Sequence, residues 1–169
     1  LLDTQAATGT LALVGAIADG ASSPSLSGNA QVTAKVTATD GAGSGATQMR
    51  LGGSLAELGT APWQAVASQL PWTLSPGDGV KTVFVQLRDA AGNDSSATTP
   101  VQAQLTLDTT PPTTPVLTVT APASMGPGNA VATTALTLTI ATTDSAGSLA
   151  TGRVQVQGDL SVGASTGWL

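Results

Sequence analysis

The chain has 169 residues, of which only 9% are charged, and ten acidic against five basic residues give a formal net charge of −5. It contains no His, Cys or Tyr, which excludes Ser-His-Asp and Cys-His catalysis, disulfides and metal sites built on thiolate or imidazole. The acidic balance argues against nucleic acid as a partner, and no run of 18 apolar residues predicts a membrane span.

Short segments with a hydrophobic period of two predict that the chain consists of β-strands. In residues 32–38, Val and Ala alternate with Thr and Lys, as expected for a half-buried strand. The one candidate helix, 54–58, is too short to be expected to matter. Turns rich in Gly, Asp and Asn follow at short intervals, so antiparallel pairing is expected throughout. The predicted strands are 11–17, 32–38, 48–51, 80–88, 101–107, 116–119, 136–140 and 153–157.

The sequence repeats itself at an offset of 104 to 105 residues. The tripeptide at 2–4 recurs at 107–109, Trp63 recurs as Trp168, and the turn at 38–44 resembles that at 142–148. Two domains are therefore predicted, 1–108 and 109–169, with the Pro-rich segment 111–115 as a stiff connector.

The second domain lacks counterparts of the strands at 80–88 and 101–107. We therefore expect either that the natural chain continues or that a neighbouring subunit supplies the missing strands. The first residues, Leu-Leu-Asp-Thr, carry neither an initiator Met nor a basic signal-peptide start, which suggests an interior piece of a longer protein.

Three stretches of the first domain resemble a known family. They are Trp-Thr-Leu at 72–74 with Gly-Asp-Gly-Val-Lys-Thr-Val-Phe-Val-Gln at 77–86, Asp-Ala-Ala-Gly-Asn at 89–93, and Leu-Asp-Thr-Thr-Pro-Pro at 107–112. The chain resembles the bacterial immunoglobulin-like domains found in tandem in large extracellular and cell-surface proteins. About seven short strands in about 100 residues fit the same class. The expected fold class is all-β: tandem immunoglobulin-like antiparallel β-sandwiches, the second one incomplete.

The resemblance implies no activity of its own. It implies a structural or adhesive module of a large secreted or surface-anchored bacterial protein, such as a stalk, a filament subunit or a coat. Its partners would be neighbouring domains or subunits, and a surface glycan or protein receptor. The alternative is an accessory carbohydrate-binding or spacer module of a secreted carbohydrate-active enzyme.

A carbohydrate-binding module requires at least two exposed aromatic side chains on one face. We expect Trp63 and Trp72 to cover strands or core instead, whereas Phe84 should face away from the core because it alternates with Val at 83 and 85. No carboxylate pair suits glycoside hydrolysis, since Glu57 is the only Glu. The basic side chains expected to be solvated charges on strand faces or edges are Arg50, Lys81, Arg88 and Arg153.

The expected strand order gathers acidic residues at the two ends of the first domain. Ca²⁺ takes six to eight oxygen ligands from carboxylates and loop carbonyls, so either end could hold this ion. The other interpretation is that these Asp residues only form turns, because they follow no contiguous calcium-loop spacing. The set expected at the leading end is Asp3, Asp40, Asp89 and Asp94, and the set expected at the junction of the domains is Asp19, Asp78, Asp108 and Asp144.

Overall fold

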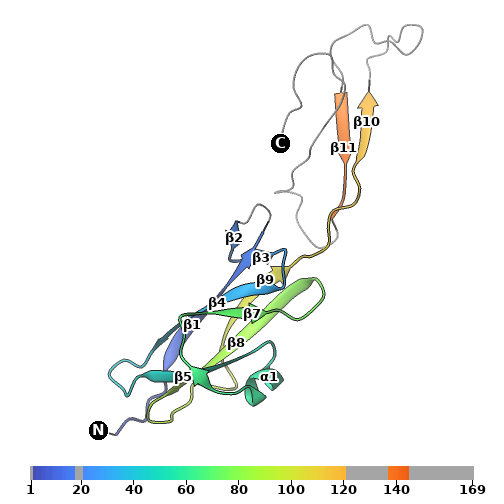
Figure 1. Cartoon of the computed structure of the whole chain (residues 1–169). Coiled ribbons are helices and arrows are strands. Elements are labelled where there is room, and N and C mark those ends of the chain that lie inside the picture. Colours follow the sequence, from blue (N-terminus) through green and yellow to red (C-terminus); the bar gives the residue numbers. More distant parts are fainter. Residues whose placement is uncertain (1, 18–20, 121–136, 145–169) are drawn as a thin grey trace, which may run out of the picture. The chain divides into compact units, whose positions relative to one another are not determined.

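The computed structural model describes residues 2–17, 21–120 and 137–144, and the chain divides into two compact units, Leu1–Thr109 and Thr110–Leu169. The strands of unit 2 are β10 (Val116–Thr120) and β11 (Thr137–Ala141). The elements of unit 1 are β1 (Thr8–Ala16), β2 (Ser22–Ser23), β3 (Leu26–Ser27), β4 (Gln31–Thr39), β5 (Ala46–Gly52), α1 (Leu55–Thr60), β6 (Gln64–Ala65), β7 (Gln69–Thr73), β8 (Gly79–Asp89) and β9 (Val101–Leu107) (Figure 1).

Unit 1 contains two sheets that pack face to face. The strand order is β2-β1-β4-β7 in the first sheet and β3-β9-β8-β5-β6 in the second. The long strands pair in antiparallel fashion, with seven residue pairs between β1 and β4 and seven between β8 and β9. The expected all-β fold class is therefore confirmed.

The core lies between these two sheets and follows the period of two that the sequence predicts. In β4, Val32, Ala34 and Val36 are buried, whereas the Thr and Lys residues between them are exposed or half-buried. Phe84 is half-buried on the face of β8 opposite the core residues Val83 and Val85, as its alternation with them predicts. The buried apolar residues of the core are Ala7, Leu11, Leu13, Val32, Ala34, Val36, Met49, Leu51, Leu74, Val83, Val85, Leu87, Leu105 and Leu107.

One pairing differs from the expected all-antiparallel arrangement. β3 pairs with β9 in parallel, with Leu26 opposite Thr106 and Ser27 opposite Leu107. β1 and β4 both belong to the first sheet, and between them the chain crosses to the second sheet, where it forms β3. Gly15 permits this crossing, because a Cβ there would lie 2.5 Å from the carbonyl oxygen of Leu26. A two-residue strand offers no periodicity from which this pairing could be predicted.

β7 is a further strand that the sequence pattern does not predict. Proline lacks a backbone N–H, so Pro71 argues against a strand at this position. The strand nevertheless forms, because β7 lies at the edge of its sheet and only its β4 side is paired. The predicted strand at 153–157 lies outside the described residues.

The short helix α1 is more important than the sequence predicts. Ser54 caps it by accepting a hydrogen bond from the Glu57 N–H at 3.2 Å, and the Glu57 carboxylate accepts one from the Gly53 N–H at 2.9 Å. Leu58 is only 2% exposed. A Cβ on Gly52 would collide with the backbone of Leu58, so the helix packs directly against the outer face of β5.

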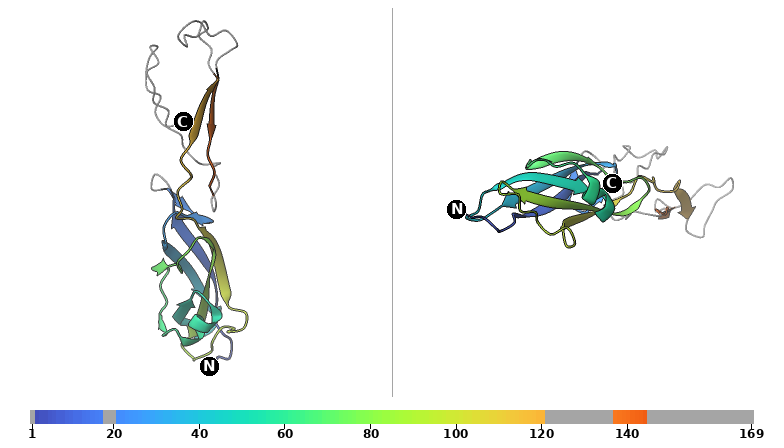
Figure 2. Two further views of the ribbon diagram at one scale, coloured as in Figure 1. Left: turned by 90° about the vertical axis from the view of Figure 1, so that its right-hand side faces the viewer. Right: turned by 90° about the horizontal axis from the view of Figure 1, so that it is seen from below.

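The chain enters and leaves unit 1 at opposite ends. Thr8 at the start of β1 pairs with Thr39 at the end of β4, whereas Leu107 at the end of β9 pairs with Gly79 at the start of β8. In Figure 1 and the left view of Figure 2, the N-terminus accordingly lies at one end of unit 1 and the chain leaves β9 at the other. Among the described residues, no helix has the length and apolar character needed to cross a membrane.

In unit 2, β10 and β11 form an antiparallel pair in which Val116 lies opposite Ala141. The apolar side chains of Val116, Leu117 and Leu138 are exposed. That unit 2 repeats the fold of unit 1 stays a prediction, because much of unit 2, including Arg153 and Trp168, lies outside the described residues.

Candidate metal centre

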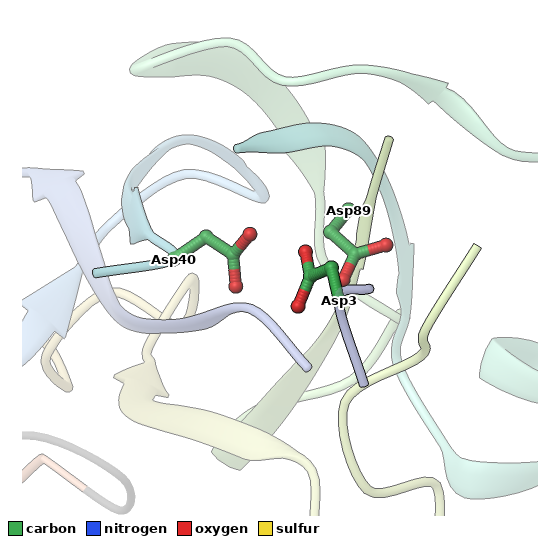
Figure 3. Close-up of side chains that lie close together, drawn as sticks. All are labelled: Asp3, Asp40 and Asp89. Atoms are coloured by element: carbon green, nitrogen blue, oxygen red, sulfur yellow. The ribbon is translucent and has the colours of Figure 1, made fainter. Parts of the chain in front are cut away.

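Three carboxylates meet at the end of unit 1 where the chain enters. One oxygen atom each of Asp3, Asp40 and Asp89 lies within 4.8 Å of the other two. Asp3 precedes β1, Asp40 follows β4 and Asp89 ends β8, so three separate segments contribute one residue each. Figure 3 shows the Asp40 carboxylate directed toward that of Asp3, with Asp89 beside it. These are three of the four acids expected at this end.

Asp89 is fixed by the turn that follows it. Its two carboxylate oxygens accept hydrogen bonds from the backbone N–H and the side-chain amide of Asn93, both at 2.8 Å. The turn is possible because Gly92 adopts a φ of 92°, a conformation that side chains disfavour. The same Asn93 amide donates to the carbonyl oxygen of Asp3 at 3.1 Å, so this turn also holds the N-terminal segment.

Asp40 is buried, with 8% of its surface exposed, and only one of its carboxylate oxygens has a hydrogen-bond partner. Oδ2 accepts from the Gly45 N–H at 2.8 Å. Oδ1 is buried and has no partner. A buried polar atom without a partner carries a free-energy cost, and one in a carboxylate costs more than one in a neutral group.

Asp3 is half-buried and binds to the loop that contains Asp40. Its carboxylate accepts hydrogen bonds from the Ser44 N–H at 2.6 Å and from the Gln5 N–H at 3.1 Å. Hydrogen bonds from Ser44, first from its side chain and then from its backbone, hold the pKa of Asp3 below its ordinary value. Asp3 is therefore ionised at neutral pH.

Among the described residues, the cluster of three carboxylates has no basic partner. In the part of the chain that the structure describes, no Lys or Arg forms an ion pair with Asp3, Asp40 or Asp89. Negative charges at this separation repel one another, most strongly where burial removes them from water. Carboxylate oxygens without sulfur or imidazole suit the hard cations Ca²⁺ and Mg²⁺. The residues present therefore fit a cation held by oxygen ligands.

Asp94, the fourth acid expected here, is not part of the cluster. Its carboxylate forms a two-pronged ion pair with the Arg88 guanidinium, with Nη2 donating to Oδ2 at 2.9 Å. The hydrogen bond from Arg88 is the main cause that lowers the pKa of Asp94. Arg88 and Asp94 face each other across a β-bridge, a contact that acidic residue spacing alone cannot predict.

Of the acids expected at the junction of the domains, Asp78 and Asp108 belong to unit 1. The Asp78 carboxylate accepts hydrogen bonds from the N–H and the hydroxyl of Thr109, at 2.8 and 2.7 Å, at the end where the chain leaves unit 1. The Asp108 N–H donates to the Ser27 carbonyl at 2.9 Å. Asp19 lies outside the described residues and Asp144 belongs to unit 2. A Ca²⁺ site at the junction stays a prediction.

Arg50 and Arg88 lie on the outer faces of β5 and β8 and are partly exposed, as expected for strand-face charges, but both also contact Trp63. The guanidinium carbons of Arg50 and Arg88 lie 4.7 and 4.1 Å from the centre of the Trp63 ring. Arg50 also donates to the side-chain oxygen of Gln86 at 2.8 Å, and the Gln86 amide donates to the Ser95 carbonyl at 2.6 Å. Trp63 thus covers the outer face of β5 and β8, as expected, and the two arginines hold it there.

Trp63 and Trp72 do not form a common surface. Trp72 lies in β7 of the first sheet and packs against the core, whereas Trp63 covers the second sheet. A depression of about 280 Å³ is lined by Trp72, Glu57 and Lys81 among others. The Glu57 carboxylate accepts a hydrogen bond from the Gly53 N–H, and the Lys81 ammonium donates one to the Pro76 carbonyl at 3.1 Å. Both polar groups therefore already have partners.

Comparisons of the chain with protein-family models, with curated protein sequences and with solved structures find no match.

Proposed function

We propose that unit 1 is a non-catalytic, load-bearing module of immunoglobulin-like type. It belongs to a large secreted or surface-anchored bacterial protein, in which it serves as part of a stalk, filament or coat. The strand order supports this proposal, because β1-β4-β7 facing β9-β8-β5-β6, with β3 beside β9, matches the immunoglobulin-like arrangement of two antiparallel sheets.

The main support for the proposal is the direction in which a tensile force on the two chain ends would act on the strands of unit 1. A pull on both ends of the chain draws β1 and β9 lengthwise in opposite directions, because the chain enters before β1 and leaves after β9 at the opposite end. Each strand is held by seven residue pairs, to β4 and to β8 respectively. These hydrogen bonds would be loaded together in shear, rather than broken one after another.

The short or proline-containing edge strands support a role as one module in a series. At the edges lie β2, β3 and β6, of two residues each, and β7 with its Pro71. Such edges discourage lateral pairing with other chains. The partners proposed for unit 1 are therefore the neighbouring modules or subunits along the same fibre. A further proposed partner is a glycan or protein receptor that the fibre binds.

A carbohydrate-binding module is the weaker candidate. Its sugar platform would need coplanar exposed rings, whereas Trp63 and Trp72 cover different sheets and Trp63 is in contact with two arginines.

Engineered disulfides that join two strands, called locks here, test the load-bearing role. The chain has no native Cys, so each engineered pair can form only one disulfide. Ala12→Cys with Lys35→Cys joins directly opposed residues of β1 and β4, and the control, Gln48→Cys with Ala65→Cys, joins opposed residues of β5 and β6. The chain is stretched between protein handles fused to its two ends. Both locks should shorten the extension released on unfolding, which verifies that they have formed.

Only the lock between β1 and β4 should raise the unfolding force, and reduction should abolish the increase. If this lock leaves the unfolding force unchanged, or if the control lock raises it equally, the load does not pass through β1 and the proposed function is wrong.

A further inference from the structure

We propose that Asp3, Asp40 and Asp89 bind one Ca²⁺ ion, which fastens the N-terminal segment of unit 1 to the β4–β5 and β8–β9 loops. This inference is independent of the load-bearing role, because a module can transmit force with or without the ion.

The first supporting observation is the convergence of the ligands. Asp40 lies 37 positions after Asp3, and Asp89 lies 49 positions after Asp40, yet the three bring carboxylate oxygens within 4.8 Å of one another. Among the described residues, none of the three forms an ion pair. The surrounding N–H groups of Gly45 and Asn93 orient the carboxylates. Each carboxylate oxygen that accepts one such hydrogen bond keeps a second lone pair for a cation.

The second, independent observation is the state of Asp40. Its Oδ1 atom is buried without a hydrogen-bond partner, in a side chain that points into the cluster (Figure 3). The Asp89 carboxylate, in a residue only 2% exposed, lies close by, so two of the three carboxylates are shielded from water. A divalent cation would satisfy the unpartnered oxygen and neutralise two of the three charges.

The ligand chemistry favours Ca²⁺ over other ions. Thiolate and imidazole are absent from the chain, so ions that prefer softer ligands are poor candidates. Mg²⁺ demands near-ideal octahedral geometry, whereas Ca²⁺ accepts six to eight oxygens in flexible arrangements. Ligands drawn from three separate loops fit the less demanding ion, with loop carbonyls or water completing its shell.

Titration of the full chain with CaCl₂ after treatment with chelator tests the site. The amide resonances of Ser44, Gly45 and Asn93 in NMR spectra report on it locally, so that binding elsewhere in the chain is distinguished. These resonances should shift saturably below about 10 mM Ca²⁺, since extracellular modules bind this ion with dissociation constants of about 0.1–1 mM. MgCl₂ over the same range should produce a weaker response.

Three variants assign the ligands. Asp40→Asn and Asp89→Asn should each weaken Ca²⁺ binding at these resonances at least about tenfold, because each removes a charged ligand. Asp94→Asn is the matched control, since Asp94 lies at the same end of unit 1 but pairs with Arg88. It should leave the affinity for Ca²⁺ within about twofold.

Melting temperatures of Asp40→Asn separate a metal ligand from a merely structural carboxylate. An asparagine can still accept the Gly45 N–H, while its NH₂ group donates toward the other two carboxylates. In chelator the variant should therefore melt at or above the temperature of the unmodified protein, and in 10 mM Ca²⁺ it should melt below it.

The proposal is overturned if the three resonances do not respond saturably to Ca²⁺, or if Asp40→Asn binds as tightly as the unmodified protein. It is also overturned if Asp40→Asn melts lower by the same amount in chelator and in Ca²⁺, because Asp40 would then act only as a hydrogen-bond acceptor.

Discussion

Gly52 determines how closely α1 approaches the sheet, because its missing side chain leaves space for the backbone of Leu58. Gly52→Ala should lower the free energy of unfolding by about 1–3 kcal/mol, the usual cost of overpacking. Gly59→Ala, in the same helix but with no neighbour near its added Cβ, should raise it by about 0.5–1 kcal/mol. Denaturant unfolding measures both, and equal effects of the two substitutions would contradict this packing.

The Arg88–Asp94 ion pair should make stability depend on acid pH. Arg88 lowers the pKa of Asp94 in the folded state below its ordinary value of 3.8, so the pair stabilises the fold above that pH. The stabilisation is lost as the pH falls through the lowered pKa and Asp94 becomes protonated. It is small, because both side chains are about one third exposed.

Asp94→Asn should therefore be slightly less stable than the unmodified protein at neutral pH, with a difference that disappears well below pH 3.8. Thermal unfolding over a pH series measures this difference. A difference that persists unchanged in strong acid would mean that Asp94 stabilises the fold through packing rather than charge.

The sequence locates the individual acidic residues better than it locates their contacts. Asp3, Asp40 and Asp89 lie together as the expected strand order implies, since β1 begins at the end of unit 1 where β4 and β8 end. The pairing of Asp94 with Arg88 and the contact of Trp63 with two arginines depend on side chains from different segments. Local patterns carry no signal for such contacts.

Among the elements, α1 contributes to stability through a single side chain. Leu58→Ala should lower the free energy of unfolding by about 2–5 kcal/mol, because Leu58 is 2% exposed. The matched control Leu55→Ala removes a side chain that is 51% exposed and should change stability by less than about 0.5 kcal/mol. Similar losses for both variants in denaturant unfolding would show that α1 is stabilised by helix formation alone.

The long strands were predictable because each buries one face, which imposes a period of two on the sequence. Two other elements were not predictable: β3 has only two residues, and β7 contains Pro71, which argues against a strand. The helix was predicted close to its observed position, but its burial was not, since a six-residue helix shows too little of its periodicity to indicate which residue faces the sheet.

At the scale of the whole molecule, the repeat in the sequence predicts two similar domains, of which unit 1 has the all-β architecture expected. Nothing in the local pattern indicates that chain entry and exit at opposite ends would load β1 and β9 in shear. That property emerges only from the combined order of strands in the two sheets.

The force needed to unfold unit 1 in two pulling directions tests its load-bearing role most directly. Handles on Leu2→Cys and Pro112→Cys load β1 and β9 in shear, whereas handles on Ser75→Cys and Pro112→Cys peel β9 from β8, beginning at the Gly79–Leu107 pair. At the same loading rate, the first direction should require a clearly higher force. An equal or lower force in the first direction would contradict the proposal that unit 1 is built to carry tension along its chain.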